Sequence, residues 1–138
     1  KCVKKIAYVL HERGTVAKIG AVTVRKMQET YGTDPADVYA AIGPSICQEC
    51  YEVSEDVILE FKKSFAPEHW EKLFYKKENG KYQLNLWEAN KIIFTEAGIT
   101  ENHISMPGIC TCCNPEFLFS HRASHGKRGN LGAFLGLK

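Results

Sequence analysis

The stretch Asn85–Gly98, "NLWEANKIIFTEAG", carries the clearest structural signal in the chain. Asn85 followed three residues later by Glu88 is an Asn-led variant of the capping box, which marks the start of a helix. Gly98 is typical of the residue just beyond a helix end. Between them, apolar side chains recur every three or four residues: Leu86, Ala89, Ile93, Phe94 and Ala97. This spacing predicts an amphipathic helix with one buried face.

Helices and short apolar strands alternate in the sequence before this stretch. A helix is predicted over residues 15–31 because apolar side chains recur there at helical spacing. A further helix is predicted after Ser54, whose side chain can cap it. Two short apolar runs, residues 5–10 and 37–43, are typical of buried strands.

The polar stretch 76–82, with Asn79-Gly80 at its centre, predicts a turn of the hairpin type. Residues 103–109 read as a strand or edge strand interrupted by Pro107, and residues 130–137 as a closing strand. Two strands would then run together near the end. Together with the earlier alternation, this order favours a single mixed-sheet domain of α+β or α/β class over residues 1–138.

The composition is that of an ordinary globular domain. With 18 basic and 16 acidic residues the net charge is only +2, so neither nucleic acid nor an anionic membrane is an expected partner. The apolar runs are shorter than the ~18 to 20 residues of a membrane span, and the N-terminus lacks the apolar core of a secretory signal. We therefore expect a cytoplasmic protein. The first residue is Lys, which suggests that the sequence begins inside a longer chain.

Five of the six cysteines gather in two short segments, at Cys47, Cys50, Cys110, Cys112 and Cys113. They are too sparse for a disulfide scaffold and indicate thiols kept reduced. Read as C-x-x-C and C-x-C-C, the segments could present four thiolates to a structural zinc ion. Two alternatives stay open. One cysteine could be a nucleophile activated by His121 or His125, or the thiols could be ordinary buried side chains.

The glycine-containing basic segment from Ser124 to Asn130 predicts an anion-binding loop. Small residues would let backbone N–H groups approach the anion, while Lys127 and Arg128 neutralise its charge. A solvated basic turn is an equal alternative on spacing alone. The interleaved basic and stacking aromatic residues of a nucleic-acid surface are not apparent.

His11 lies at the end of the first predicted strand, just before a helix. Strand ends that feed helix N-termini commonly hold ligands. His11 is therefore a candidate ligand residue, although an ordinary boundary residue is the commoner interpretation. The neighbouring Arg13 could pair with an anion or with a structural carboxylate.

Three stretches taken together resemble a known family. They are "RGTVAKIG" at 13–20, "AAIGPSICQECYEVSEDV" at 40–57 and "CTCCNPEFLFSHRASHGKRGNLGAFLGL" at 110–137. They look like the C-terminal part of the bacterial multicopper-polyphenol-oxidase-like family, also called the laccase-domain or peptidoglycan editing factor family. Its members are now read as zinc-dependent purine nucleoside phosphorylases. Family chains are longer, so this chain resembles an incomplete copy.

The resemblance implies an α+β fold with mixed sheets sandwiched between helices. It also implies phosphorolysis of adenosine, inosine, guanosine and methylthioadenosine to the free base and ribose-1-phosphate, with adenosine deamination as a side activity. The implied partners are a purine nucleoside and phosphate.

The cofactor implied by the resemblance is a zinc ion held by His, Cys and His. One of these ligands precedes a Gly-Trp-Arg-Gly block in the family. Arg13 and Gly14 match the end of that block, the Gly-Trp pair is missing, and His11 is the matching ligand only if a gap is allowed. The Val-His-Gly and Asp-Cys segments that supply the other two ligands are not recognisable in this chain.

The resemblance also implies roles for the C-terminal segment. It places His121 and Arg122 toward the substrate, next to Ser120, with Lys127 and Arg128 nearer the surface. Arg13, Arg122 and a zinc ion bound by His11 would share the positioning and charge neutralisation of phosphate.

Three other functions compete with this interpretation. A copper-dependent polyphenol oxidase follows from the older family name, but the sequence contains no His-x-His pair of the kind that multicopper oxidases need. A peptidoglycan-precursor editing hydrolase could use a Cys-His site. An inactive fragment lacking two zinc ligands is the third alternative, and it leaves a homodimer open.

Overall fold

The computed structural model describes residues 4–8, 12–127 and 129 of the 138 residues. Its strands are β1 (Lys4–Tyr8), β2 (Val38–Ile42), β3 (Glu52–Val53), β4 (Phe74–Lys76), β5 (Tyr82–Leu84) and β6 (Ile104–Ser105). Its α-helices are α1 (Glu12–Val16), α2 (Ile19–Tyr31), α3 (Glu55–Ser64), α4 (Trp70–Leu73) and α5 (Leu86–Glu96). Short 3₁₀ turns are η1 (Pro35–Asp37), η2 (Gln48–Cys50), η3 (Pro67–His69) and η4 (Glu101–His103).

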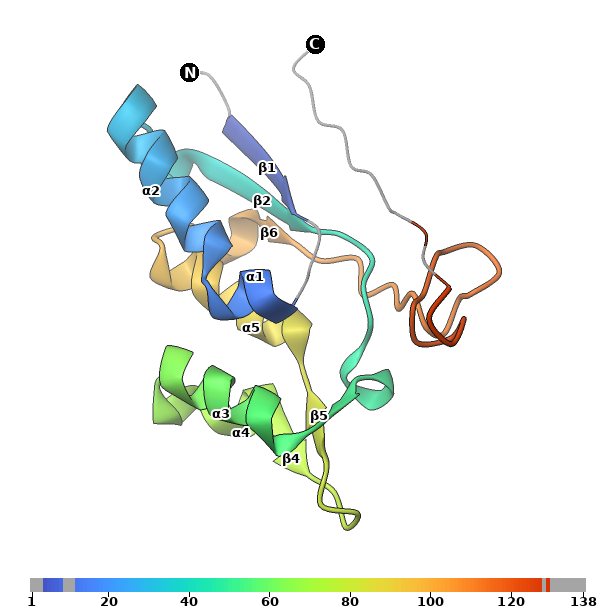
Figure 1. The fold of residues 1–138 in the computed structure, drawn as a ribbon. Helices are drawn as coiled ribbons and strands as arrows, with labels where there is room; N and C mark the ends of the chain where they lie inside the picture. The colour runs from blue at the N-terminus through green and yellow to red at the C-terminus, as the bar shows by residue number, and fades with distance from the viewer. Residues whose placement is uncertain (1–3, 9–11, 128, 130–138) are drawn as a thin grey trace.

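The strands form two small sheets, and α5 contributes to the hydrophobic core beside each of them (Figure 1). The first sheet has the parallel order β1-β2-β6, and the second has the antiparallel order β3-β5-β4. Ile93 of α5 belongs to the cluster that contains α3 and β5, whereas the adjacent Phe94 belongs to the cluster that contains α2 and β2. One helix therefore joins the two cores.

The predicted boundaries of α5 are confirmed. The Asn85 side-chain oxygen accepts a hydrogen bond from the backbone N–H of Glu88 at 3.0 Å. After the helix, Gly98 adopts a positive φ of 92°, a conformation that L side chains rarely adopt. Four of the five predicted apolar side chains are buried. The fifth, Ala97, is partly buried and packs against the cluster that contains Phe94.

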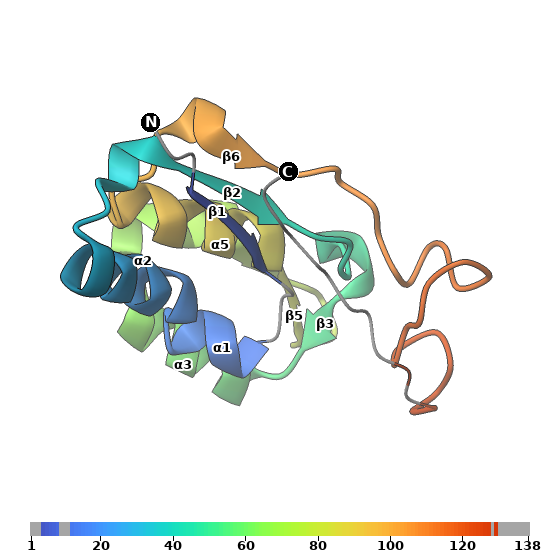
Figure 2. The same ribbon diagram turned by 90° about the horizontal axis from the view of Figure 1, so that it is seen from above.

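Helices α2 and α5 cover one face of the parallel sheet, as the view from above shows (Figure 2). Alternate residues of β2, namely Val38, Ala40 and Ile42, are buried against them. Tyr39 and Ala41 lie on the opposite face and are exposed. The buried strand predicted at residues 37–43 is thus confirmed, with only one of its faces packed on helices in the described part of the chain.

The single helix predicted over residues 15–31 is wrong, because the chain breaks at Lys18. Lys18 takes a left-handed conformation, φ 49° and ψ 40°, between α1 and α2. The break lets α2 approach α5 closely: a Cβ placed on Gly20 would lie 2.9 Å from the Phe94 ring. Periodicity could not show this, because both short helices keep apolar residues at similar spacing.

The strand predicted at 103–109 is shortened to Ile104–Ser105, paired with β2. The chain then leaves the sheet, because Pro107 has no N–H to donate and Gly108 adopts a φ of 67°.

The predicted turn around Asn79-Gly80 is confirmed as the loop between antiparallel strands β4 and β5. Ser54 stands at the start of α3, but its hydroxyl bonds the Asp56 side chain rather than capping the helix. The closing strand predicted at 130–137 lies outside the described residues.

The predicted α+β class is confirmed, and the mixture of parallel and antiparallel pairing is divided between the two sheets. A buried polar contact adds to the apolar packing: the Asn90 side-chain amide on α5 donates to the Thr15 hydroxyl on α1 at 3.0 Å. Both side chains are almost completely buried.

None of the helices in the described ranges combines the length and apolar character needed to cross a lipid bilayer.

Replacing Phe94 with Ala should lower the free energy of unfolding by about 3 to 5 kcal/mol, because the ring is fully buried between α2, α5 and β2. Chemical denaturation followed by circular dichroism measures this change. Leu59→Ala is the matched control, because Leu59 lies on α3 with half of its surface exposed and should change stability by less than about 0.5 kcal/mol. Equal losses in both variants would contradict the assigned core.

Besides the backbone pairing of β3 with β5, one carboxylate on β3 holds the turn of the β4–β5 hairpin. Glu52 accepts bonds from Lys77 at 2.6 Å and from the Asn79 side chain at 3.2 Å, and pairs with Lys81 at 3.2 Å. The hydrogen bond from Lys77, followed by those from Asn79 and Lys81, lowers the pKa of Glu52 from 4.5 to about 2. The ionised carboxylate is therefore favoured in the folded state.

Because this pKa is depressed on folding, the contribution of Glu52 to stability is present above pH 4.5 and is lost as pH falls toward 2. We therefore expect Glu52→Gln to destabilise the protein at pH 6 and to differ much less from the wild type near pH 2. Denaturation midpoints across this pH range provide the measurement. Glu78→Gln, an exposed position in the same hairpin turn, controls for the loss of one negative charge. A pH-independent effect of Glu52→Gln would refute this linkage.

Candidate functional site

The segment Ser120–Lys127 forms a tight loop held by its own backbone. The side-chain hydroxyl of Ser120 accepts a hydrogen bond from the N–H of Ala123, and the backbone carbonyl of Ser120 accepts one from the N–H of Ser124. The N–H of Gly126 donates to the carbonyl of His121, and the N–H of Lys127 donates to that of Ser124. His125 and Gly126 close the loop with positive φ values of 50° and 95°.

These internal bonds limit the predicted backbone anion cradle of residues 124–130 in its described part, and the rest of it stays a prediction. The N–H groups of residues 123–127 already donate within the loop, so they are not directed at a ligand. Anion binding at this loop would instead depend on its side chains. His121, His125 and Lys127 are exposed, whereas Ser120 is buried and serves the loop itself. Arg128 lies outside the described residues.

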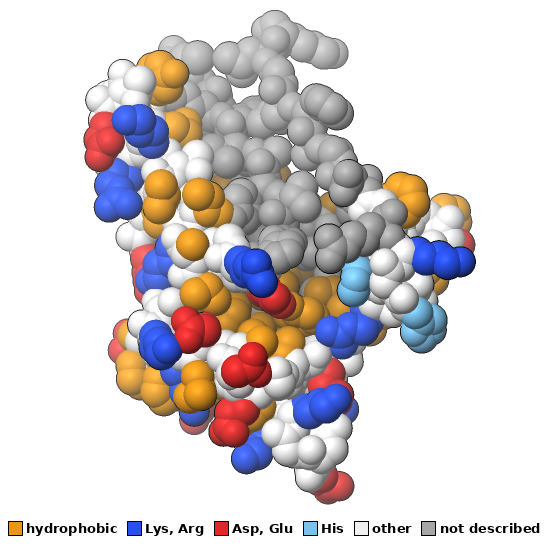
Figure 3. All heavy atoms as spheres, viewed as in Figure 1, with side chains coloured by type: hydrophobic (Ala, Val, Ile, Leu, Met, Phe, Trp, Pro, Cys, Tyr) orange, Lys and Arg blue, Asp and Glu red, His pale blue; other side chains and the backbone are white. Residues whose placement is uncertain are grey.

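Figure 3 shows histidine and basic side chains gathered on this outlying part of the molecule. The exposed aromatic residues Phe117 and Phe119 precede the loop in the chain, and 83% and 63% of their surfaces are accessible. The loop therefore joins cationic and apolar groups on one projecting segment.

Arg122 docks this loop on the segment around β3. Its guanidinium donates to the carbonyl oxygen of Glu52 at 3.1 Å and to that of Cys50 at 3.4 Å. The group also lies 5.5 Å from the centre of the Tyr51 ring. In this arrangement Arg122 is a positioning residue for the loop, and the direct substrate contact implied by the resemblance stays a prediction.

Tyr51, which lies against the Arg122 guanidinium, also contacts α1. Its hydroxyl donates to the carboxylate of Glu12, and burial, followed by this hydrogen bond, raises the pKa of Tyr51. Glu12 directly precedes Arg13, which is exposed on α1. The structure thus brings the start of α1 close to the Arg122 loop through Tyr51. The preceding residue, His11, lies outside the described residues, so its predicted role as a metal ligand stays a prediction.

The cysteines form the densest group of reactive side chains in the described part of the chain. The sulfur atoms of Cys47, Cys50, Cys110 and Cys113 all lie within 4.8 Å of one another. Cys50 and Cys113 approach to 3.5 Å, and the backbone N–H of Cys47 donates to the Cys110 sulfur at 3.2 Å. Cys112 is not a member of this group. The arrangement could hold a metal ion.

Burial and neighbouring groups shift the pKa values of Cys47, Cys50 and Cys110 in different directions. Burial raises the pKa of Cys47 to about 11, helped by the hydrogen bond with Cys110. Burial also acts to raise the pKa of Cys110, but hydrogen bonds from the backbone N–H groups of Cys47 and Cys113, and from their thiols, outweigh it and lower the pKa to about 7. Burial, followed by the hydrogen bond with Cys113, raises the pKa of Cys50. Among Cys47, Cys50 and Cys110, the Cys110 sulfur is therefore the most readily ionised.

For a four-thiol metal site, the sequence contains a stronger signal than the C-x-C-C spacing. Omitting Cys112 leaves Cys110-x-x-Cys113, which repeats the spacing of Cys47-x-x-Cys50. Two C-x-x-C pairs are the usual ligand spacing of tetrahedral zinc sites. The predicted group of four thiols is therefore present, and Cys112 is the one of the five clustered cysteines that lies outside it. Tyr51 and Glu12 were also missed, because nothing in the local sequence indicates their contact.

A cysteine nucleophile paired with a histidine receives no support from the geometry. Among the described residues, the cysteine sulfurs contact one another and backbone groups, and no hydrogen bond joins them to His121 or His125. The zinc site of His, Cys and His is not assembled by these residues either, since the one candidate group that they form contains four thiols.

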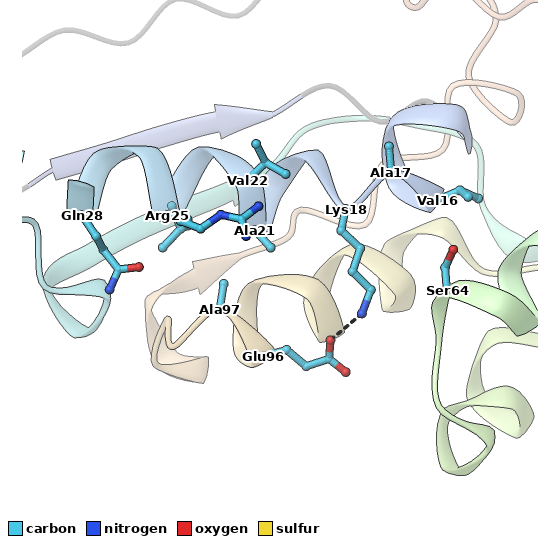
Figure 4. A pocket seen from close by; sticks show the side chains of 11 residues that line it. Val16, Ala17, Lys18, Ala21, Val22, Arg25, Gln28, Ser64, Glu96 and Ala97 are labelled. Carbon is cyan, nitrogen blue, oxygen red and sulfur yellow. Dashed lines mark hydrogen bonds and ion pairs between the residues drawn. The ribbon is translucent and has the colours of Figure 1, made fainter. Parts of the chain in front are cut away.

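A separate hollow lies between the α1–α2 junction and the ends of α3 and α5 (Figure 4). Lys18 and Glu96 form an ion pair at 2.9 Å across it, and Arg25 and Gln28 add polar groups from α2. None of the predicted site residues lines this hollow. The chemistry predicted from the sequence is therefore concentrated at the cysteines and the 120–127 loop.

Arg122→Ala should loosen the 120–127 loop, because two hydrogen bonds to the β3 segment are lost. A loss of about 1 kcal/mol in local stability would speed cleavage by chymotrypsin at the exposed Phe117 and Phe119 about fivefold. Mass spectrometry of the digest gives the rates. Lys127→Ala, which removes one positive charge from the same loop, should leave the rate nearly unchanged. Equal rates in all three proteins would show that Arg122 does not fix the loop.

Comparison with known proteins supports the family resemblance. A family model described as "Multi-copper polyphenol oxidoreductase laccase" matches residues 4–138. Purine nucleoside phosphorylase YlmD from Bacillus subtilis (strain 168) is 36% identical over 138 residues, covering 99% of this chain and 49% of that protein. The protein named adenosine deaminase RL5, from an unknown prokaryotic organism, is 33% identical over 110 residues, 80% of this chain and 41% of that protein.

The fold agrees with the same group of proteins. The crystal structure of YlmD from Geobacillus stearothermophilus matches with a TM-score of 0.80 and 34% sequence identity, over 86% of this chain and 44% of that chain. The chain spans about half the length of the curated relatives it matches. On these matches, the chain belongs to the multi-copper polyphenol oxidoreductase laccase family.

Proposed function

We propose that this chain takes part in the phosphorolysis of purine nucleosides to the free base and ribose-1-phosphate. Relatives that cover nearly the whole chain are named purine nucleoside phosphorylases, which supports this class of reaction. The observation in the structure that carries the proposal is the projecting loop with exposed His121, His125 and Lys127. Cationic side chains on such a loop suit a phosphate dianion.

The reaction places clear demands on these residues. An oxygen of inorganic phosphate attacks C1′ of the ribose, the bond between C1′ and N9 of the purine breaks, and the purine leaves with the bonding electrons and takes up a proton. A positively charged loop would hold phosphate and offset its charge as the two reactants meet. His121 and Lys127 would contact phosphate, and Arg122 would hold the loop in position through Cys50 and Glu52.

The proposed substrates are adenosine, inosine, guanosine and methylthioadenosine. The exposed Phe117 and Phe119, next to the cationic loop, provide flat apolar faces of the kind on which a purine ring can stack. Phosphate and purine recognition would then lie on neighbouring parts of one segment. A homodimer and a cytoplasmic location belong to the same proposal.

Adenosine deamination is a second candidate, favoured by the similarity to the protein named adenosine deaminase RL5. Zinc would supply it with hydroxide by lowering the pKa of bound water, and His11 remains the residue of this chain proposed for that metal. Polyphenol oxidation is not favoured, because the five histidines of the sequence contain no His-x-His pair. The thiol group described above also lacks the imidazoles of multicopper sites.

Purified protein supplied with zinc, inosine and phosphate should release hypoxanthine and an equal amount of ribose-1-phosphate, and omission of phosphate should abolish both. Chromatography of base and sugar phosphate measures the two products. Adenosine distinguishes the second candidate, because deamination yields inosine without any need for phosphate. Base release that is independent of phosphate would overturn the proposal in favour of hydrolysis.

His121→Ala should lower kcat/KM for inosine at least about tenfold, which corresponds to about 1.4 kcal/mol of transition-state stabilisation. His69→Gln is the matched control, because His69 lies in η3 and pairs with Glu96 at 3.4 Å. It should leave kcat/KM unchanged. A similar loss in both variants would indicate general destabilisation rather than a role of the loop in substrate binding.

A further inference from the structure

The two C-x-x-C pairs adopt equivalent local structures although 63 positions separate them in the sequence. In the first, Cys47 precedes the 3₁₀ turn Gln48–Cys50, and in the second, Cys110 precedes a turn at residues 111–113. The backbone N–H of Cys50 donates to the carbonyl of Cys47 at 3.2 Å, and the side chain of Asn114 donates to the carbonyl of Cys110 at 2.7 Å. Each pair thus forms a short knuckle that turns both of its sulfurs to the same side.

Backbone pairing places the two knuckles face to face. The segments before them join at an isolated parallel bridge between Ser45 and Cys110. The N–H of Ser45 donates to the carbonyl of Ile109 at 3.2 Å, and the N–H of Thr111 donates to the carbonyl of Ser45 at 3.1 Å. The proximity of the thiols therefore follows from a fixed backbone register.

The spacing of the sulfurs fits a tetrahedral metal site. Four sulfurs at ~2.3 Å from a central zinc ion lie about 3.8 Å from one another. Here all four lie within 4.8 Å of one another, and Cys50 and Cys113 are 3.5 Å apart. A contraction of less than about 1 Å between the other sulfurs would complete the tetrahedron.

The surroundings of the sulfurs suit thiolates. The backbone N–H of Cys47 donates to the sulfur of Cys110 at 3.2 Å, which stabilises a negative charge on that sulfur. The guanidinium of Arg122 lies beside the first knuckle, bonded to the carbonyl of Cys50 at 3.4 Å. A zinc ion with four thiolates carries two negative charges, which a neighbouring cation partly offsets.

We propose that Cys47, Cys50, Cys110 and Cys113 bind a structural zinc ion that fastens the C-terminal loop to the segment between β2 and β3. Binding replaces four S–H bonds with four Zn–S bonds and releases the four protons to solvent, without any change of oxidation state. With four protein ligands the ion has no open position for substrate, so its role is structural. This site differs in donors and position from a zinc ion held by His11, and it stands or falls independently of the proposed phosphorolysis.

The zinc ion would control the position of the 120–127 loop. The second knuckle continues through Asn114, whose side-chain amide donates to the Cys110 carbonyl at 2.7 Å, into the segment that leads to Ser120. Arg122 then returns to the first knuckle through Cys50 and Glu52. Metal and guanidinium would thus hold the chain on both sides of the segment 114–121, which leads into this loop.

The test is the zinc content of the purified protein and three variants, measured by inductively coupled plasma mass spectrometry after extensive dialysis. Cys113→Ser should lose one zinc ion per chain relative to the wild type, because it removes one of four ligands. Cys112→Ser is the matched control and should lose none, since it removes the neighbouring thiol outside the group. Cys113→His should regain the metal, because three cysteines and one histidine also form a tetrahedral zinc site.

The exposure of Cys113 keeps its variants informative, since a polar replacement there should not disturb the core. Circular dichroism verifies that each variant is folded. Replacement of the metal by Co²⁺ gives an independent measurement, because four thiolates around tetrahedral Co²⁺ produce intense visible and sulfur-to-metal charge-transfer absorption. This absorption should be present in the Cys112→Ser variant and lost in the Cys113→Ser variant.

Three results would overturn the proposal. One is an equal zinc content in the Cys113→Ser and Cys112→Ser variants. A second is a folded wild-type protein without zinc in which Cys50 and Cys113 form a disulfide. The third is copper or iron in place of zinc with the same dependence on Cys113, which would reject the assignment to zinc.

Discussion

The packing of α5 against both small sheets is the constraint on which the rest of the structure depends. Ile93 and Phe94 are neighbours in the chain and lie in different hydrophobic cores. A small sheet needs a hydrophobic face or a packed helix to be stable, and each three-stranded sheet here gains an apolar partner from the same helix. The close approach of Gly20 to Phe94 and the buried bond between Asn90 and Thr15 then fix α1 and α2 on this helix.

The C-terminal loop is fastened to this framework in a different way. It carries no regular element between β6 and residue 127, and it projects from the body of the molecule. Its attachments are polar: the parallel bridge at Ser45 and Cys110, the facing cysteine pairs, and the guanidinium of Arg122 on the backbone of β3. Such a segment is held by a few specific contacts, so each of them has a large effect on its position.

This arrangement separates two kinds of chemistry that the sequence places side by side. The cysteines lie where two chain segments meet and offer ligands to a structural ion. His121, His125 and Lys127 of the loop that follows are exposed to solvent. The proposed metal clamp would give the neighbouring loop a defined geometry without occupying the exposed side chains of that loop.

Local patterns in the sequence determined the elements whose signals are complete within a few residues. The cap at Asn85, the apolar face of α5, the buried strand at β2 and the turn at Asn79-Gly80 follow from propensity, periodicity and turn chemistry. The three motifs at residues 13–20, 40–57 and 110–137 were sufficient to indicate the family. Only the tertiary structure decided the break at Lys18, because the redirected helix gains its contact with Phe94 from a partner 74 positions away from Gly20. It also decided that Cys113, and not Cys112, joins the other thiols, and that Arg122 turns back on β3. These contacts join residues far apart in the sequence, and their distances depend on how the two cores pack around α5.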